Sequence, residues 1–494
     1  MADITKYLYS LFSTVPLNYS YVHIPTPDEP KNVANNNIQY YVNKVITNLT
    51  RQAFFHSGFK FTESTAWNAS WGRQYNMNEY EKCKCWQKIN HYAGAFLMGR
   101  KDNLHMRMTE LKEKVGSFAD FYPESYLLPK EQEKLNNAWK NHPMWIVKPS
   151  ASSRGIGIHL VSNKDPVPTV AGIVQYYIEK PLLVQDRKFD IRLYVLVSSI
   201  EPMRIYMHSA GMARFCTHKY VENSCPKDLY MHLTNFSLNK DDKGFKRSDG
   251  VNENIDDSKW TIGFFMDYCK SQGYDTDKLM KEFERITVST IIAGMNEIKK
   301  THKKVIPHHY TSYEMYGIDI MLDSELNAHL LEINISPSLS GMDSKLDFNM
   351  KYPLNLDLFR MARIIDCQPN KEHPCPEVEL IEKEFYDSVN EQRIKEVVND
   401  GIDPWENPVF ADLVMIRDFI EESQIKSGFR LVYPVKETMD TFIPCFKSLD
   451  YYDTVFLSWI RKSEEEQKSV IENNINMYSN KIQEILKKTM VLDN

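Results

Sequence analysis

The chain of 494 residues is 42% hydrophobic and 26% charged, which is typical of a soluble globular protein with about three domains of ~150 residues each. No apolar run approaches the ~18 residues of a membrane span, and the net charge of −6 argues against a nucleic-acid binder, because phosphate contacts need a basic surface. The eight cysteines lack zinc-ligand spacing and Met1 to Pro16 lacks a signal-peptide cleavage pattern, so we expect reduced thiols and a cytosolic protein.

The central part of the chain predicts strands and one long helix. Residues Met144 to Ile200 contain short β-branched and aromatic runs between turn residues, which indicates mainly strands. Asp275 to Lys300 has apolar residues at helical spacing. Strands are predicted again at Tyr316 to Leu322 and His329 to Ile335.

A composition break separates this part from the C-terminal region. The polar, proline-containing stretch Gln368 to Glu377 predicts a linker. Pro408 to Ser423 and Ser463 to Lys488 then predict helices, the second heavily charged. We therefore expect an accessory helical extension.

The first chemical motif is WIVKPSASSRGIGIHLV, in which a strand ending at Lys148 meets a loop that leads into a second strand at Ile156. A dinucleotide fingerprint requires its glycines to open a helix, so this pattern indicates a hairpin instead. Gly155 allows backbone amides to approach phosphate oxygens, and Lys148 and Arg154 bring positive charge to the same place. The alternative is an ordinary hairpin with exposed polar residues.

The second motif is VQDRKFDIRLYVLV, a strand with charged residues at every second position. A period of two places Lys188, Asp190 and Arg192 on one face. This face is either part of a charged site or a solvated sheet surface. The apolar residues of the other face are Phe189, Ile191 and Leu193.

The third motif, YGIDIMLDSELNAHLLEINISPS, reads as two strands joined by a turn near Ser324 to Asn327. A tight hairpin there places Asp319 opposite Glu332, with Asn334 two residues further on the same face. Three oxygen ligands without His or Cys suit Mg²⁺, which binds nucleotide phosphates. The alternative is a surface salt-bridge cluster.

These motifs together provide a lysine and arginine loop for phosphates, a charged strand and a magnesium hairpin, which is the equipment for phosphoryl transfer. No G-x-S-x-G elbow, H-E-x-x-H motif or kinase H-R-D loop is present. The motifs resemble those of the tubulin tyrosine ligase-like family of the ATP-grasp superfamily, in its glutamylase branch. The resemblance covers Trp86 to Arg363 through WQKINHYAGAFLMGRKDNL, WIVKP, SRGIGI, VQYYIEKPLL, KFDIRLYVLV, GMARF, HLTNFS, GIDIMLD and LEINISPSL.

The resemblance implies an α/β (α+β) ATP-grasp fold with N-terminal, central and C-terminal lobes and a helical C-terminal extension. The expected segments are an N-terminal domain (1–143), a central ATP-grasp domain (144–230), a C-terminal ATP-grasp domain with the magnesium hairpin (231–367), a linker (368–377) and the extension (378–494).

Site residues carry over position by position. By resemblance, the catalytic residues are Lys148, Arg154 and Arg192, and the metal ligands are Asp319, Glu332 and Asn334. The residues implied to bind the free glutamate substrate are Arg214, Phe236, Ser237 and Lys259. The residues implied to bind ATP are Lys148, Arg154, Gly155, Gln175, Tyr176, Tyr177, Ile178, Lys188, Phe189, Asp190, Thr234 and Asn235.

The sequence departs from the family pattern at three places. Phe236 stands where a tyrosine is typical, Tyr176 where a basic residue is typical, and Asp186-Arg187 where Asp-Gly is usual. The first departure removes a hydroxyl from the expected amino-acid pocket.

The implied activity is an ATP- and Mg²⁺-dependent ligase that joins free glutamate to a glutamate side chain of a target protein, tubulin, through an acyl phosphate. We expect a monomer that is located in the cytoplasm and on the cytoskeleton, with the cilium or basal body as a further implied location. Two basic segments could bind the acidic tubulin tails, Lys299 to Lys304 and the residues Arg100, Lys101, Arg107, Lys112 and Lys114, although lysines that end a helix are also favoured by its dipole. The alternatives are an inactive microtubule-binding protein with the same fold, a ligase that adds glycine, and an ATP-grasp ligase for small molecules.

Overall fold

The computed structural model describes residues 2–15, 17, 19–31, 37–151, 155–222, 227–248, 250, 253–306 and 308–492. At its centre lies a seven-stranded antiparallel sheet. Its strands are β9 (Leu183–Val184), β10 (Arg187–Ile200), β11 (Met203–Phe215), β12 (Lys259–Thr261), β13 (Glu314–Leu322), β14 (Ala328–Asn334) and β15 (Phe429–Tyr433). The order is β12-β11-β10-β13-β14, with β9 paired to β10 and β15 to β11.

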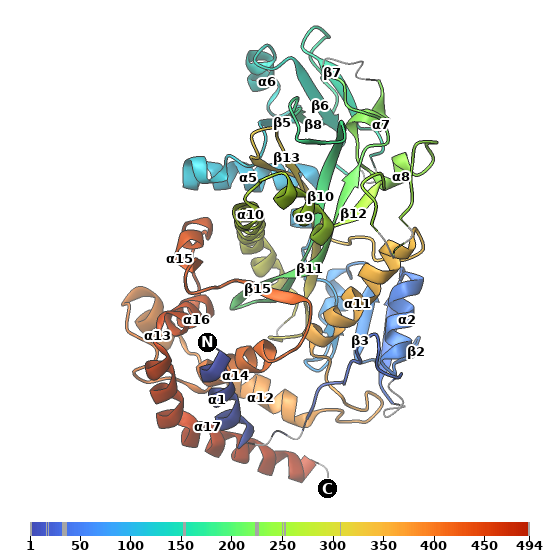
Figure 1. Cartoon of the computed structure of the whole chain (residues 1–494). Helices are drawn as coiled ribbons and strands as arrows, with labels where there is room; N and C mark the ends of the chain where they lie inside the picture. The colour runs from blue at the N-terminus through green and yellow to red at the C-terminus, as the bar shows by residue number, and fades with distance from the viewer. Residues whose placement is uncertain are drawn as a thin grey trace.

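Helices cover both faces of this central sheet (Figure 1). On one face, α10 packs against inward side chains of β10 and β13 such as Ile191 and Ile318. On the other face, α11 packs against Tyr194 and Leu196 of β10. The helices involved are α4 (Phe96–Gly99), α5 (Lys101–Val115), α9 (Ile262–Ser271) and α10 (Thr276–Val305) with α11 (Lys345–Ala362). The predicted helix at 275–300 and the predicted strands at 316–322 and 329–335 are therefore confirmed.

A smaller antiparallel sheet stands at one end of the central sheet, at the top of Figure 1. It contains β5 (Ser125–Leu128), β6 (Met144–Lys148), β7 (His159–Ser162) and β8 (Gly172–Tyr176) in the order β5-β8-β6-β7, with α6 (Gln132–Ala138) packed beside it. The loop of the first motif joins β6 and β7, which pair antiparallel, so the predicted hairpin is confirmed. The second strand begins at His159 rather than Ile156.

A parallel sheet forms the N-terminal lobe. Its strands β1 (Gln39–Asn43), β2 (Lys60–Thr62), β3 (Ala69–Gly72) and β4 (Lys88–Ile89) follow the order β2-β1-β3-β4. The lobe includes α2 (Asn48–His56) and α3 (Met77–Tyr80). Phe54 of α2 packs against Phe359 of α11 with 4.2 Å between ring centroids, so the lobe is attached to the helix that covers the central sheet.

The C-terminal region forms a helical unit at the bottom left of Figure 1. Its helices are α12 (Pro376–Asp387), α13 (Glu391–Ile394), α14 (Phe410–Ser423), α15 (Met439–Phe442), α16 (Tyr451–Arg461) and α17 (Glu464–Leu492), and α14 and α17 confirm the two predicted helices. The extension is not purely helical, because β15 joins the central sheet beside β11. The first helix of the chain, α1 (Ala2–Ser13), also belongs to this unit, since Phe12 packs edge-on against Tyr478.

Short helices complete the structure. These are α7 (Leu229–His232), α8 (Phe236–Asn239), η1 (Gly116–Ala119), η2 (Lys395–Asn399) and η3 (Ile443–Cys445). None of the helices within the described residues combines the length and the apolar composition that a membrane crossing requires. The five segment boundaries expected from the sequence stay a prediction.

Candidate functional site

A cavity of about 80 Å³ lies between the small sheet and the central sheet. Strands β6 and β8 form one wall, and β10, β13 and β14 form the other. The walls combine apolar side chains, among them Ile146, Met321 and Leu331, with charged ones. The expected nucleotide residues on the lining are Lys148, Gln175, Tyr176, Tyr177, Ile178, Lys188, Asp190, Thr234 and Asn235.

Two buried lysines face this cavity from opposite walls. Lys148, at the end of β6, donates to Oε1 of Gln175 at 2.6 Å, and Lys188 of β10 donates to the hydroxyl of Tyr177 at 3.0 Å. Neither lysine makes an ion pair within the described residues. Burial lowers the pKa of each to about 8, and the nearby charge of Lys148 acts in the same direction on Lys188. Two buried cations with only neutral partners fit an anionic ligand such as a phosphate chain.

The segment after β8 forms the apolar end of the cavity. Tyr177 and Ile178 are buried, and the Tyr177 hydroxyl hydrogen-bonds with Nδ1 of His232 at 2.8 Å. The ring of Tyr177 also packs against the Lys188 ammonium group, whose Nζ lies 4.1 Å from the ring centroid. Apolar side chains beside a cationic end suit a nucleotide base joined to phosphates.

Two arginines and two aspartates form a buried cluster across three strands. The register places Asp190 opposite Arg214 and Arg192 opposite Asp319. Nε of Arg214 donates to Oδ1 of Asp190 at 2.8 Å, and Arg214 also lies 2.9 Å from Oδ2 of Asp319. Nη2 of Arg192 donates to Asp319 at 2.8 Å. Although burial acts in the opposite direction, the two guanidinium groups hold the pKa of Asp319 well below its usual range, so it is a carboxylate at neutral pH.

The predicted hairpin register is observed between β13 and β14. Asp319 pairs directly with Glu332, and Asn334 pairs with Gly317. A register shift between Asp319 and Ile320 moves the strand pairing by one residue in the part of the hairpin nearer the turn. The Asn334 amide lies 3.3 Å from Oε1 of Glu332 and 3.5 Å from Oδ2 of Asp319, so the three side chains meet at one point.

This set of two carboxylates and one amide could hold a Mg²⁺ ion. Its donors are all oxygen atoms, which hard divalent cations prefer. Because the set contains only two carboxylates, it is not a cluster of three His, Cys, Asp or Glu side chains, and the described residues contain no such cluster that could hold a metal. The residues present therefore fit both a polyphosphate and its magnesium ion at this cavity.

The amino-acid residues implied by the resemblance fall into two places. Arg214 belongs to the buried cluster with Asp190 and Asp319. Lys259 pairs across the sheet with Arg214, lies 2.8 Å from Oδ2 of Asp347, and stands 3.9 Å above the ring of Phe236. Phe236 and Lys259 line a narrow adjoining pocket with Lys246 and Arg247, Phe245, Ser248, Asp343 and Ser344.

This adjoining pocket has an excess of positive charge. Asp347 also pairs with Lys351 at 2.7 Å, so one carboxylate serves two lysines. Such an excess is suited to a ligand with a carboxylate. Ser237 lies beside Phe236 in α8 and is half-buried.

Two expected nucleotide residues are not among those that line the cavity. Phe189 does not line the cavity, because alternation along β10 turns its ring into the core, where it packs against Phe215 and Phe265. Gly155 has φ +78° and approaches Asn235, where an added Cβ would lie 3.1 Å from Oδ1. Arg154 lies outside the described residues.

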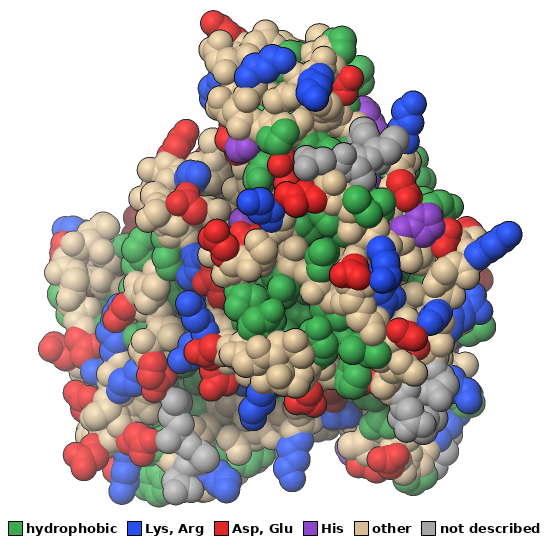
Figure 2. Space-filling view, turned by 45° about the horizontal axis from the view of Figure 1, so that its top comes forward, with side chains coloured by type: hydrophobic (Ala, Val, Ile, Leu, Met, Phe, Trp, Pro, Cys, Tyr) green, Lys and Arg blue, Asp and Glu red, His purple; other side chains and the backbone are tan. Residues whose placement is uncertain are grey.

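Sequence reasoning missed Lys101 as part of this site. Its Nζ lies 3.4 Å from Oε2 of Glu332, although the basic pattern around it suggested a tail-binding surface. The surface interpretation is also wrong for Lys299, which is buried and pairs with Asp450 and Asp453 of the extension. Figure 2 shows basic and acidic side chains mixed over the visible face rather than a single basic patch. Only the tertiary structure brings the partners of these lysines close.

A small sheet and a larger antiparallel sheet that enclose two lysines and a carboxylate hairpin define an ATP-grasp type of nucleotide-binding protein. The profile of the tubulin-tyrosine ligase family matches residues 77–372. The chain belongs to this family. ATP-grasp ligases of this kind use ATP and Mg²⁺.

Several characterised relatives are similar over much of the chain. The tubulin polyglutamylase ttll-4 of Caenorhabditis elegans is 31% identical over 455 residues, which cover 88% of this chain and 73% of the relative. The tubulin monoglutamylase TTLL4 of Homo sapiens is 32% identical over 377 residues, which cover 74% of this chain and 31% of the relative. The tubulin polyglutamylase TTLL5 of Mus musculus is 37% identical over 287 residues, which cover 57% of this chain and 21% of the relative. The chain thus spans about a third of the length of the Homo sapiens relative.

Proposed function

We propose that this chain is an ATP- and Mg²⁺-dependent ligase that joins the amino group of free glutamate to a glutamate side chain of tubulin. The observation that carries the proposal is the cavity in which two buried lysines without ion pairs face the Asp319 and Glu332 carboxylates. The printed names of the relatives, tubulin monoglutamylase and tubulin polyglutamylase, support the choice of glutamate and tubulin.

Each part of the cavity has a role in this proposal. When bound, ATP with Mg²⁺ supplies the phosphoryl group that activates the acceptor carboxylate as an acyl phosphate. Lys148 and Lys188 hold the phosphate chain, while Asp319, Glu332 and Asn334 hold the metal. Arg192 is fixed by Asp319 beside the metal ligands, where its guanidinium offsets charge that develops on the transferred phosphoryl group.

The second step needs no nucleophilic side chain. The amine of free glutamate attacks the carbonyl carbon of the acyl phosphate, a C–N bond forms, the C–O bond to phosphate breaks, and the amine loses a proton. Lys259 above Phe236 binds a carboxylate of the incoming glutamate in the adjoining cationic pocket. The isopeptide branch and free phosphate are the products.

The direct test is mass spectrometry of tubulin incubated with the protein, Mg²⁺-ATP and glutamate, glycine or tyrosine in turn. We expect tubulin peptides that gain glutamate residues only. Efficient transfer of glycine contradicts the glutamate assignment but leaves the ligase mechanism in place. No transfer of any amino acid, with tubulin bound normally, supports an inactive binding protein instead.

The Lys259→Met variant tests the amino-acid pocket. Loss of a charged hydrogen bond worth about 1.5–3 kcal/mol is expected to raise the glutamate concentration needed for half-maximal rate at least tenfold. The fold should persist because Asp347 keeps its pairing with Lys351 at 2.7 Å. Lys345→Met, an exposed lysine at the start of α11, is the matched control. An unchanged glutamate requirement in Lys259→Met contradicts the assigned pocket.

The setting of this activity follows from its target. Tubulin as substrate places the protein on the cytoskeleton of the cytoplasm. A monomeric state and a place at the cilium or basal body stay predictions.

A further inference from the structure

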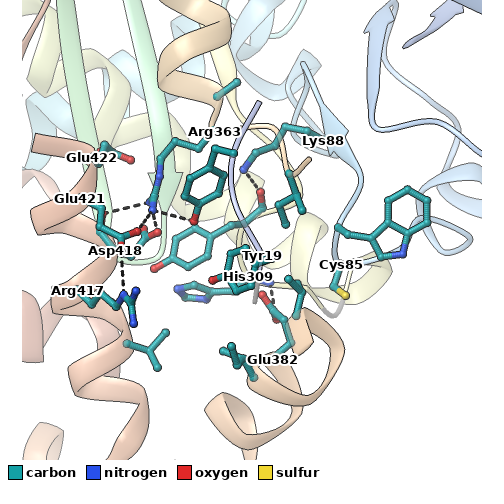
Figure 3. A pocket seen from close by; sticks show the side chains of 18 of the residues that line it. Tyr19, Cys85, Lys88, His309, Arg363, Glu382, Arg417, Asp418, Glu421 and Glu422 are labelled. Carbon is teal, nitrogen blue, oxygen red and sulfur yellow. Dashed lines mark hydrogen bonds and ion pairs between the residues drawn. The ribbon is translucent and has the colours of Figure 1, made fainter. Parts of the chain in front are cut away.

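A second cavity, also about 80 Å³, lies away from the nucleotide site. It is enclosed where the N-terminal lobe, the far end of the central sheet and the helical extension meet (Figure 3). Lys88 comes from β4, Arg204 from β11, Glu382 from α12, and His309 from the segment that follows α10. The cavity therefore exists only when the extension is docked on the rest of the molecule.

Most of the charges in this cavity neutralise one another. Three arginines pair with three carboxylates of α14, and Figure 3 shows these carboxylates grouped on one side. Arg204 pairs with Asp418 at 2.9 Å and Glu422 at 3.0 Å. The other pairs are Arg363 with Asp418 and Glu421, and Arg417 with Glu421.

Lys88 and Glu382 are the exceptions. Among the charged lining residues that the structure describes, they alone make no ion pair, either with each other or with a third group. Lys88 donates to the carbonyl oxygen of Tyr310, and Glu382 accepts from the backbone N–H of His309 at 3.1 Å. Figure 3 shows them on the same side of the cavity, with His309 beside Glu382.

The neighbours of this pair are also incompletely bonded. Nη1 of the fully buried Arg204, Nε2 of His309 and the hydroxyl of Tyr310 have no hydrogen-bond partner within the described residues. Burial lowers the pKa of Lys88 to about 8 and raises the pKa of Glu382 to about 7. Both pKa shifts are in the direction of the neutral form, and a bound counter-charge would oppose them.

We propose that this cavity is a binding site for a small zwitterion, a free α-amino acid. Lys88 and the unpaired Nη1–H of Arg204 bind its carboxylate, and Glu382 accepts from its ammonium group. The apolar side chains of Ile381 and Phe385 on α12 offer a surface to the amino-acid side chain. Two groups of opposite charge that line one cavity and make no ion pair select a ligand that carries both charges, since a ligand with either charge alone leaves one group unpaired.

This site is distinct from the proposed glutamate pocket. Among the described residues, none lines both the second cavity and the glutamate pocket. Arg192, in the cluster beside the nucleotide cavity, and Ser198, which lines the second cavity, both belong to β10. Six residues of extended strand separate them by roughly 20 Å. A ligand in the second cavity would therefore contact the extension rather than the reacting groups, and would stabilise its docking.

Isothermal titration calorimetry and thermal unfolding of the full chain test the proposal. The probes are L-alanine, acetate as the carboxylate half, methylamine as the ammonium half, and inorganic phosphate. We expect L-alanine to bind with one-to-one stoichiometry and raise the midpoint of thermal unfolding, and each half-ligand to bind at least tenfold more weakly. No binding of L-alanine overturns the proposal and indicates a water-filled cavity, and tighter binding of phosphate overturns it in favour of an anion site.

Two variants locate the bound amino acid. Lys88→Met and Glu382→Gln should each weaken L-alanine binding at least tenfold, whereas the exposed controls Lys164→Met and Glu81→Gln should leave it unchanged. Lys259→Met should also leave it unchanged, and a loss of binding in that variant instead places the amino acid in the glutamate pocket. If a cavity variant fails to fold, the affinities of the four probes for the unmodified chain still test the proposal.

Discussion

At the scale of single residues, the candidate site depends on charges that have no compensating partner in the protein. Lys148 and Lys188 lie buried beside neutral acceptors, and their pKa values are lowered to about 8. Asp319 has the opposite situation, since two arginines stabilise its carboxylate. Binding of a polyanion therefore balances the charge of the two lysines. Substitution of a lysine and substitution of a metal-site carboxylate are expected to affect different properties of the protein.

The affinity for ATP should fall as the pH rises above 8. Each lysine must be protonated to bind phosphate, and each loses its proton through a pKa of about 8 in the ligand-free protein. We expect at least tenfold weaker ATP binding at pH 9.5 than at pH 8, with a shallower dependence in Lys148→Met. Calorimetric titration across this pH range measures it. A flat profile contradicts the phosphate role of these lysines.

Glu332→Gln should remove most of the proposed ligase activity with little change in folding. The substitution keeps the size of the side chain but removes one of two carboxylates from the metal set, and an effect of about a hundredfold or more is expected. Glu325→Gln, an exposed residue in the turn of the same hairpin, is the control. Rates measured against Mg²⁺ concentration distinguish metal loss from misfolding, and normal turnover in Glu332→Gln excludes the metal assignment.

At the scale of elements, β10 shows how one strand serves both the core and the site. Its alternating residues place Lys188, Asp190 and Arg192 towards the site, while Ile191 is fully buried in the core between the sheet and α10. The same alternation explains why Phe189 is a core residue and not a nucleotide contact.

The two faces of β10 should respond oppositely to substitution. Ile191→Ala leaves a cavity and should lower stability by about 2–5 kcal/mol while ATP affinity changes little. Lys188→Met should raise the stability of the ligand-free protein at pH 7, because the folded pKa of about 8 lies below the unfolded value and burial of the charge is unfavourable at this pH. Its ATP affinity should fall at least tenfold. Thermal unfolding with and without ATP checks both, and a destabilised Lys188→Met contradicts the account.

At the scale of the whole molecule, buried ion pairs attach the extension to the central sheet. Arg204 of β11 is fully buried against Asp418 and Glu422 of α14, and Lys299 of α10 pairs with Asp450 and Asp453 at the start of α16. Strand β15 adds main-chain pairing to β11. The extension is thus part of the folded body and not a separate appendage.

Arg204→Met should weaken this attachment strongly. The substitution leaves two carboxylates with reduced compensation in a buried place, which costs about 3–5 kcal/mol when one partner of such a pair is removed. We expect a fall of at least about 3 °C in the midpoint of thermal unfolding and faster proteolysis of the extension. Arg430→Met removes a solvent-exposed ion pair with Glu284 and should change little. Equal effects of the two substitutions contradict the role assigned to Arg204.

The sequence alone determined those features that depend on neighbouring residues. Strand periodicity fixed the faces of β10, and the turn position fixed the pairing of Asp319 with Glu332. Apolar spacing located α10, α14 and α17, and a series of short motifs in order was enough to indicate the family. Each of these follows from short-range geometry, in which a residue's position along a strand or helix sets its direction.

Only the tertiary structure decided which distant groups are neighbours. It placed Arg214 against Asp319, Lys101 against Glu332, and α1 within the C-terminal helical unit. Lysines in a basic run look alike in sequence, yet Lys299 is buried in an ion pair whereas Lys304 is exposed. The physical reason is that charge compensation depends on contacts between elements, and no local pattern encodes which carboxylate will lie opposite a given cation.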